Sequence, residues 1–388
     1  NQSIMWFQLL TLLFVVVAQA QSQDSYESEL NEFMEQVPDS DEILPLDING
    51  RSAFGDDDEE DPDHFMRSLE DEYEGATHSS WNSCDNDLIE SRSFLDFKFL
   101  KKLARNLNPF TKAGSRMKFY LFKREFAECG RELIFKKHRL AHYAGFNSSL
   151  PTRIIIHGWM SQSRGSFNRD VKNSYLKNGD YNVIVADWSG SSANINYFGV
   201  VKLIEEFGAQ LVQFTRELHR QLQADYDDMY LIGHSLGAQI AGAAGKRLKP
   251  QQYNTIFALD PAGPRFRQRS AEFRIDPTDA KYVESMHTSG NFGFLRPTGS
   301  ATFYPNYGLY QKNCFYLGCS HIRAYQMFAE SINSPKGFWG TPCQRQKNKW
   351  QCDQTQRQAF RMGGEPSIPK EGIYYVKTAF SDPFALGN

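Results

Sequence analysis

The sequence predicts an α/β fold in which helices cover both faces of a mostly parallel sheet. Beyond residue 115, short β-branched runs alternate with segments of helical periodicity, which is the pattern of parallel strands joined by crossover helices. Glycine and polar residues follow these runs directly, at the edge where open α/β sheets place their sites. The 388 residues suffice for a sizeable core, and 40% hydrophobic composition excludes a collagen-like or wholly disordered chain.

Five short apolar runs are expected to be the central strands, at residues 153–156, 182–186, 229–232, 255–259 and 282–286. A helix is predicted over residues 201–222, where apolar side chains form one stripe, and a second over 236–248, which is rich in Ala and Gly. Residues 372–378 are expected to form a last strand of the same domain. We place this domain at residues 81–388.

The N-terminus predicts a signal peptide over residues 1–20. An almost unbroken apolar run covers residues 6–18 and is followed by the cleavage pattern Ala18-Gln19-Ala20. The run is too short to span a bilayer, so no transmembrane segment is expected. The alternative is a buried N-terminal helix. A signal peptide implies a secreted, extracellular protein.

The charge of the chain is unevenly distributed. The formal net charge is −3, but residues 21–80 carry −18 and residues 81–388 carry +15. The acidic segment holds few aliphatic clusters, so we expect a disordered arm or pro-segment there. The basic remainder contains no recognised nucleic-acid module, so a nucleic-acid partner is not expected.

Six cysteines in an exported chain predict three disulfides. Local spacing favours Cys314 with Cys319 and Cys343 with Cys352, which leaves Cys84 with Cys129. No C-x-x-C pair suggests zinc. The sequon that begins at Asn147 predicts N-glycosylation on a surface loop.

Residues 233–237 form a G-x-S-x-G pentapeptide centred on Ser235. An apolar strand leads in and a helix of small residues leads out, which is the setting of a nucleophile elbow. A serine nucleophile needs a base and an orienting carboxylate, expected in the chain order Ser, Asp, His. Asp260 ends the next strand and fits the role of the orienting carboxylate. The alternative, Asp187, precedes the serine and so breaks this order.

Two histidines, His287 and His321, follow Asp260, and spacing alone does not choose between them. An oxyanion hole needs two backbone N–H donors. One is expected from Leu236, after the nucleophile, and the other from Trp159, in the loop after an early strand.

Five segments together resemble the animal pancreatic lipase family, most closely its insect members and its phospholipase A1 branch. They are TRIIIHGW (152–159), GHSLGAQ (233–239), ALDPAGP (258–264), DPTDA (276–280) and CSHIRA (319–324). The likeness covers about residues 84–388. It implies an α/β-hydrolase fold and ester hydrolysis, assigns His321 as the catalytic histidine, and places His287 on a structural position.

Departures from the best-known lipases point to phospholipids. In the family, the loop between the cysteines before the catalytic histidine is the lid, and here only four residues separate Cys314 from Cys319. The loop over residues 287–304, which corresponds to the family's second active-site loop, is also short compared with that of triglyceride lipases. Only 36 residues follow Cys352, so the C-terminal lipid-binding β-sandwich is expected to be absent, and with it a colipase-like partner.

The sequence therefore predicts a secreted serine esterase acting on lipids, a phospholipase A1 that cleaves the sn-1 ester of glycerophospholipids. Alternatives are a triacylglycerol or galactolipid lipase, and a non-catalytic lipid-binding or storage protein like insect yolk proteins. The intact Ser235, Asp260 and His321 argue against the last. No cofactor is needed for this chemistry. Asp276 and Asp279 match an acidic pair that holds a structural calcium in some relatives, or form a surface turn.

Overall fold

A computed structural model describes residues 116–136, 139–142, 145–194, 196–316, 318–346, 349–353 and 360–387. The predicted signal peptide, the acidic arm and Cys84 lie outside these residues. No helix within the described ranges is long and apolar enough to cross a membrane.

In the described residues, seven parallel strands form the centre of the sheet; the mostly parallel sheet was predicted, but the strand β10 (Ala301–Pro305) was not. In spatial order they are β6 (Asn182–Asp187), β5 (Thr152–Ile156), β7 (Met229–His234), β8 (Thr255–Leu259), β9 (Tyr282–Met286), β10 (Ala301–Pro305) and β14 (Gly372–Val376). All five central strands expected from the sequence are present, and the predicted last strand is β14 beside β10.

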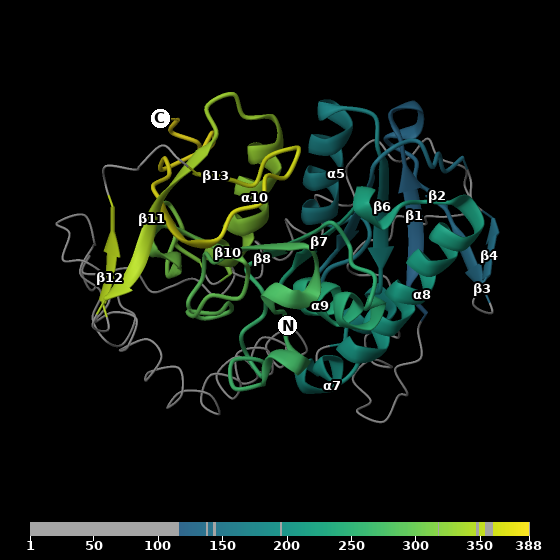
Figure 1. Cartoon of the computed structure of the whole chain (residues 1–388), viewed down its shortest axis with the longest axis horizontal. Coiled ribbons are helices and arrows are strands. Elements are labelled where there is room, and N and C mark those ends of the chain that lie inside the picture. The colour runs from purple at the N-terminus through teal and green to yellow at the C-terminus, as the bar shows by residue number, and fades with distance from the viewer. Residues whose placement is uncertain are drawn as a thin grey trace, which may run out of the picture.

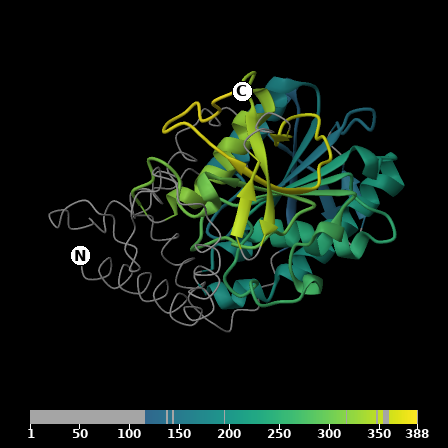
Figure 2. The ribbon, with the colours of Figure 1, turned by 60° about the vertical axis from the view of Figure 1, so that its left-hand side comes forward.

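Antiparallel strands extend both edges of this sheet. One edge has β1 (Lys118–Phe122) and β2 (Arg131–Glu132), and the other has β11 (Phe338–Gln346), β12 (Lys349–Cys352) and β13 (Phe360–Met362). Figure 2, which brings the latter end forward, shows the light-green antiparallel strands in front of the parallel ones. A separate hairpin pairs β3 (Ile134–Lys136) with β4 (Arg139–His142).

Two pairs of helices cover the two faces of the sheet. On one face α5 (Ser166–Asn178) packs against α10 (Cys319–Asn333), and on the other α8 (Ile204–Leu222) packs against α9 (Leu236–Leu248). Figure 1 shows α5 and α10 above the sheet and α8 and α9 below it. The other helices of the described residues are short: α6 (Ser189–Ser192), α7 (Tyr197–Val201), η2 (Arg124–Phe126), η3 (Tyr226–Asp228), η4 (Ala271–Phe273), η5 (Pro277–Asp279) and η6 (Asn306–Gly308).

The central strands are apolar throughout because both of their sides are buried. In β5, Ile154 and Ile156 join the core beneath α8 and α9, whereas Ile155 joins the core beneath α5 and α10. The small residues of α9 let α8 approach closely, since a Cβ atom on Gly208 would lie 2.6 Å from the Cβ of Ala243. The predicted helix over 201–222 is α8, preceded by the separate turn of α7.

The order of the strands determines where a site forms. The chain runs from β5 to β6 and then returns to place β7 on the other side of β5. The connections after β5 and β7 therefore leave in opposite directions, and open α/β sheets bind ligands at such a switch point. Gly158 and Trp159 follow β5 there, and Ser235 follows β7.

Candidate active site

Ser235 occupies a strained turn between β7 and α9. Its backbone angles, φ 57° and ψ −122°, are ones that non-glycine residues rarely adopt. The turn is held in place because the Ser235 amide donates to Leu259 O at 3.0 Å and the Ser235 carbonyl accepts from the Ala262 amide at 3.1 Å. Ser235 is partly exposed while its two chain neighbours are buried. The fold thus presents this hydroxyl at the carboxyl edge of the sheet.

Several positions around Ser235 have no room for a side chain and are occupied by glycine. A Cβ atom on Gly237 would lie 1.9 Å from the carbonyl oxygen of Ile156, and one on Gly233 would lie 2.5 Å from the Ala238 nitrogen. Across the switch point, a Cβ on Gly158 would lie 2.9 Å from the Cβ of Ser235. The backbone after β5 therefore approaches the serine closely enough to exclude any side chain at residue 158.

Asp260 and His321 form a direct pair. Asp260 follows β8 and is fully buried, and its Oδ2 atom lies 2.5 Å from Nδ1 of His321 in the first turn of α10. The Asp260 carboxylate also accepts from the Thr288 amide at 2.9 Å, the Ser289 amide at 3.2 Å and the Ser289 hydroxyl. Burial acts to raise the pKa of the Asp260 carboxyl, but these donors and His321 outweigh it, so the pKa is lowered and the carboxylate is ionised.

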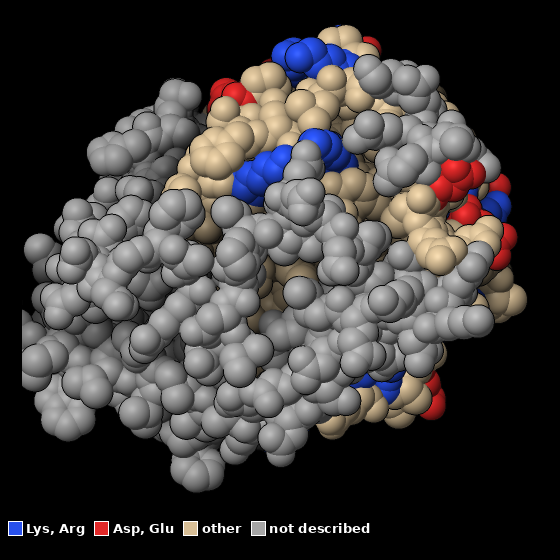
Figure 3. All heavy atoms as spheres, turned by 90° about the vertical axis from the view of Figure 1, so that its left-hand side faces the viewer, with Lys and Arg blue, Asp and Glu red and all other residues tan. Residues whose placement is uncertain are grey.

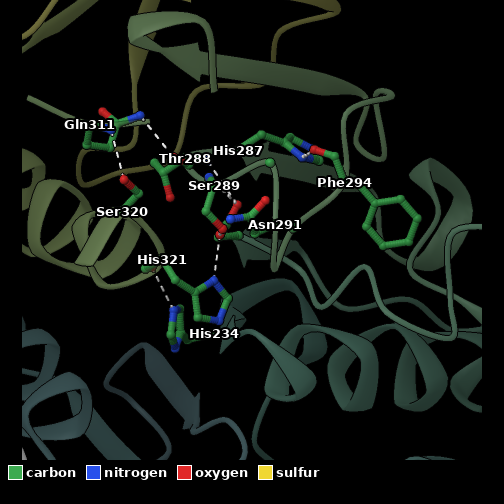
Figure 4. Close-up of polar contacts among 12 residues, drawn as sticks. His234, His287, Thr288, Ser289, Asn291, Phe294, Gln311, Ser320 and His321 are labelled. Atoms are coloured by element: carbon green, nitrogen blue, oxygen red, sulfur yellow. Dashed lines mark hydrogen bonds and ion pairs between the residues drawn. The ribbon is translucent and has the colours of Figure 1, made fainter. Parts of the chain in front are cut away.

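The protonation of the His321 ring follows from its partner. A carboxylate only accepts hydrogen bonds, so Nδ1 of His321 carries the proton, and in the neutral ring Nε2 keeps a lone pair. The ring lies between His234, with centroids 4.4 Å apart, and Phe292, with centroids 5.4 Å apart. In Figure 4, His321 points toward the loop that carries Ser289, and His234 lies beside it.

The structure brings Ser235, Asp260 and His321 to one place. His234, the residue before Ser235, contacts the His321 ring. The Ser235 amide bonds the carbonyl of Leu259, the residue before Asp260. Contacts of the backbone and of the neighbouring residue therefore place Ser235 beside the Asp260–His321 pair at one edge of the sheet.

Leu236 and Trp159, the two residues expected to stabilise an oxyanion, follow segments that meet at Ser235. Leu236 begins α9, so its N–H belongs to the first turn, which has no acceptor within the helix. Trp159 follows Gly158, whose backbone lies against Ser235. The Trp159 indole donates to Asn194 O at 2.7 Å, and the Met160 amide donates to Ser192 O at 3.0 Å. These bonds anchor the segment after β5.

The rival residues belong to other pairs. His287 is fully buried, its Nδ1 donates to Phe294 O at 2.7 Å, and its Nε2 lies 3.2 Å from the Thr298 hydroxyl. Burial lowers the pKa of His287 to about 4, so this ring is neutral and structural. Asp187 lies 3.1 Å from Nε2 of His157, at the end of β6.

The sequence did not identify the partners of the Asp260 carboxylate. Ser289 and Thr288 lie in the loop after β9, and Arg267 holds this loop by donating to the carbonyls of Gly290, Asn291 and Gly293. No motif distinguishes these residues, because their role depends on contacts between segments far apart in the chain.

One member of the acidic pair at η5, Asp279, forms an ion pair with a lysine. Lys246 Nζ lies 2.5 and 2.6 Å from the two carboxylate oxygens of Asp279 and donates to Arg274 O at 2.8 Å. The Asp276 carboxylate accepts from the Thr278 amide at 3.1 Å. Within the described residues, no three His, Cys, Asp or Glu side chains are grouped as metal ligands. Because the Lys246 ammonium binds both oxygens of Asp279 and the Asp276 carboxylate accepts from a backbone amide, these contacts do not fit a calcium ion.

Disulfides form as the local spacing predicted. Cys314 is bonded to Cys319 and Cys343 to Cys352, and Cys129 is disulfide-bonded as well. The short loop before α10 carries Phe315, whose surface is 78% exposed. Asn147 lies in an exposed turn, where its side-chain oxygen accepts from the Ser149 amide at 3.0 Å.

Comparison with known proteins relates this site to enzymes. A family model described as Lipase matches residues 95–384. The chain is 35% identical over 252 residues to "Probable phospholipase A1 magnifin" of Vespa magnifica, covering 61% of this chain and 75% of that protein. It is equally similar, at 35% identity, to "Phospholipase A1" of Vespa velutina, covering 61% and 83% of the two chains.

A vertebrate relative is "Pancreatic lipase-related protein 2" of Cavia porcellus, 35% identical over 208 residues that cover 52% of this chain and 48% of that protein. Among solved structures, the chain is similar to MGS-M1, an alpha/beta hydrolase enzyme, with a TM-score of 0.25, 15% identity and coverage of 48% and 68%. The family match spans most of the described residues and includes the edge of the sheet where Ser235, Asp260 and His321 meet. The chain belongs to the lipase family.

Proposed function

We propose that this protein is an extracellular phospholipase A1, which hydrolyses the sn-1 acyl ester of glycerophospholipids through Ser235, His321 and Asp260. The observation that carries the proposal is the 2.5 Å contact between Asp260 and His321 beside the strained turn of Ser235. The relatives named phospholipase A1 support the substrate class. The disulfides support an oxidising, extracellular location.

The proposed reaction proceeds in two steps. His321 Nε2 takes the proton of the Ser235 hydroxyl as Oγ attacks the acyl carbonyl carbon, and the amides of Leu236 and Trp159 stabilise the oxyanion. The tetrahedral intermediate collapses to an acyl-enzyme, and His321 returns the proton to the leaving lysophospholipid. Water then attacks the acyl-enzyme with the same base, releasing the fatty acid and regenerating Ser235. Asp260 keeps the His321 ring in the required tautomer throughout.

A lipid surface is the proposed partner. The Cys314–Cys319 loop holds only four residues, too few for a helical flap, and its Phe315 is exposed. On the face shown in Figure 3, Lys and Arg side chains lie in several separate places on the described surface, and acidic side chains lie near its outline. Asn147, in its exposed turn, is the proposed glycosylation site.

Triacylglycerol hydrolysis is the second candidate, because a pancreatic lipase-related protein is also 35% identical. The phospholipase A1 and triacylglycerol lipase activities are distinguished by measuring fatty acid release from phosphatidylcholine labelled at sn-1 or at sn-2, and from triolein. We expect release from the sn-1 label, little from triolein, and none with the Ser235→Ala variant. A strong preference for triolein would replace the phospholipase assignment, whereas hydrolysis by Ser235→Ala would refute the catalytic site itself.

A further inference from the structure

His234, the second residue of the G-x-S-x-G pentapeptide, links the serine turn to helix α10. It is the last residue of β7, and its side chain is buried. Nε2 of His234 lies 3.0 Å from the carbonyl oxygen of His321, a contact drawn in Figure 4. Because a carbonyl only accepts, the Nε2–H group of His234 donates this bond. The residue next to Ser235 therefore bonds the backbone of His321 directly.

Contacts from two helices hold the His234 ring. The His321 ring lies across it with centroids 4.4 Å apart, and the Tyr325 ring meets it edge-on at 5.2 Å. Phe167 of α5 closes another side at 5.5 Å. The Tyr325 hydroxyl is itself fixed by a 2.7 Å hydrogen bond with the Ser166 hydroxyl. The ring is packed by side chains from both helices of this face.

The His234 ring is neutral in this setting. Burial, together with the positive charge that His321 can carry, lowers the pKa of His234 to about 3. A neutral ring serves as a hydrogen-bond donor without repelling His321 when that ring is protonated during acyl transfer. Both contacts of His234 with His321 are therefore compatible with each protonation state of the base.

We propose that His234 is a positioning residue, which fixes the distance between the Ser235 hydroxyl and the His321 ring. The inference deepens the proposed ester hydrolysis and rests on it. His234 is bonded covalently to Ser235 and by hydrogen bond to the main chain of His321, so displacement of α10 away from the serine breaks the bond and the ring contact together. Proton transfer between serine and histidine is sensitive to sub-ångström spacing, so loss of this link slows catalysis.

Two substitutions separate the hydrogen bond from the packing. His234→Gln keeps an N–H donor of similar reach, and His234→Leu keeps an apolar side chain without a donor. We expect kcat for sn-1 hydrolysis to fall about 10- to 100-fold in His234→Leu and within about threefold in His234→Gln, with KM nearly unchanged in both. His219→Gln is the matched control, because His219 also contacts a carbonyl, that of Ala224 at 2.9 Å, beside Tyr226 at the end of α8.

A spectroscopic measurement tests the same inference without turnover. The proton on Nδ1 of His321 should give a low-field ¹H NMR resonance that is sharp in wild-type protein and in His234→Gln and broadened in His234→Leu. If His234→Leu is not secreted, His234→Asn takes its place, since its shorter amide does not reach the carbonyl. Full activity in the variant lacking the donor, equal losses in both variants, or a loss confined to KM would overturn the inference.

These outcomes are distinct from a failure of the proposed function. Ester hydrolysis that persists in Ser235→Ala, or that is absent from wild type, bears on the function. The ratio among the His234 variants and the line width of the His321 proton bear on the positioning role.

Discussion

Asp260 Oδ2 and His321 Nδ1 lie 2.5 Å apart, although 61 positions separate the two residues in the chain. Asp260 follows a buried parallel strand and His321 lies in the first turn of a helix on the face of the sheet, so the fold alone brings them together. The pair sets both the charge of the buried carboxylate and the tautomer of the ring.

Replacing Asp260 by Asn should slow hydrolysis far more than it affects folding. The amide is similar in size to the carboxylate but presents an N–H to Nδ1, which favours the wrong tautomer of His321. We expect kcat to fall by about 10⁴-fold. Steady-state kinetics on phosphatidylcholine check this, with Asp187→Asn as the comparison, since Asp187 contacts His157 instead. A loss below tenfold would contradict the orienting role.

Stability should fall at acid pH through the same carboxyl. The pKa of Asp260 is lowered in the folded state, so its stabilisation is complete above the unfolded pKa of about 4 and is lost as pH falls through the folded pKa. The free energy of unfolding, measured with urea, should fall less between pH 7 and pH 3 for Asp260→Asn than for wild type. The exposed carboxylate of Asp382 provides the control substitution, Asp382→Asn. An equal loss of unfolding free energy between the two pH values in Asp260→Asn and wild type would contradict the prediction.

Gly237→Ala should disrupt the serine turn. The added methyl carbon would lie 1.9 Å from the carbonyl oxygen of Ile156. Because that oxygen belongs to the buried backbone, the overlap cannot be relieved by turning a side chain. We expect the free energy of unfolding to drop by about 3 kcal/mol or more. Gly179→Ala is the control, because Gly179 has an extended backbone and the atom nearest to its added Cβ would belong to the Tyr181 ring, at 3.0 Å. Equal effects of the two substitutions would reject the steric argument.

The two local disulfides should differ in their effect on activity. Loop-closure entropy predicts a loss of about 2–3 kcal/mol in stability when either bond is removed by serine substitutions. Only Cys314→Ser/Cys319→Ser should also lower kcat, by roughly tenfold, because Cys319 begins the helix that carries His321 two residues later. The Cys343–Cys352 bond joins β11 to β12 at the edge of the sheet, so its removal should leave kcat unchanged. An equal decrease of kcat in both double variants would contradict this.

Phe315→Ser should weaken binding to lipid without weakening the fold. The side chain is 78% exposed, so the free energy of unfolding should change by less than about 0.5 kcal/mol. Insertion of an aromatic ring into a bilayer surface contributes about 2 kcal/mol, so binding to phosphatidylcholine vesicles should fall about tenfold or more. Hydrolysis of a soluble short-chain ester should be unchanged. The same effect from Phe273→Ser, at an exposed aromatic of η4, would argue against a specific role of the loop.

The sequence predicted the parts of the fold with a strong local pattern. The central strands are continuous apolar runs because both faces are buried, and α8 shows a full apolar stripe. Helix α5 was not predicted, since its buried Phe167, Val171 and Tyr175 stand among polar residues. Strand β11 was also missed, because it lies near the edge of the sheet and contains Gly340 and Pro342, which are typical of breaks.

In the candidate site, too, the residues that belong to a local pattern were predicted and those that act through distant contacts were not. Ser235 belongs to a local motif and Asp260 ends an evident strand, so both were found from the residues. The choice between His287 and His321 needed the family resemblance, since each follows Asp260 and spacing does not separate them. His234 and Ser289 act through contacts across the fold, and no local pattern marks such contacts.

The proposed nucleophile can be tested most directly by covalent labelling. The folded, secreted protein is treated with a fluorophosphonate probe, digested and analysed by mass spectrometry. We predict a single adduct on Ser235, formed in wild type, strongly slowed in His321→Ala and absent from Ser235→Ala, together with loss of phosphatidylcholine hydrolysis in proportion to labelling. Folded protein that takes up no probe, as a lipid-storage protein would, or an adduct on another residue that accounts for the activity, would contradict the assignment.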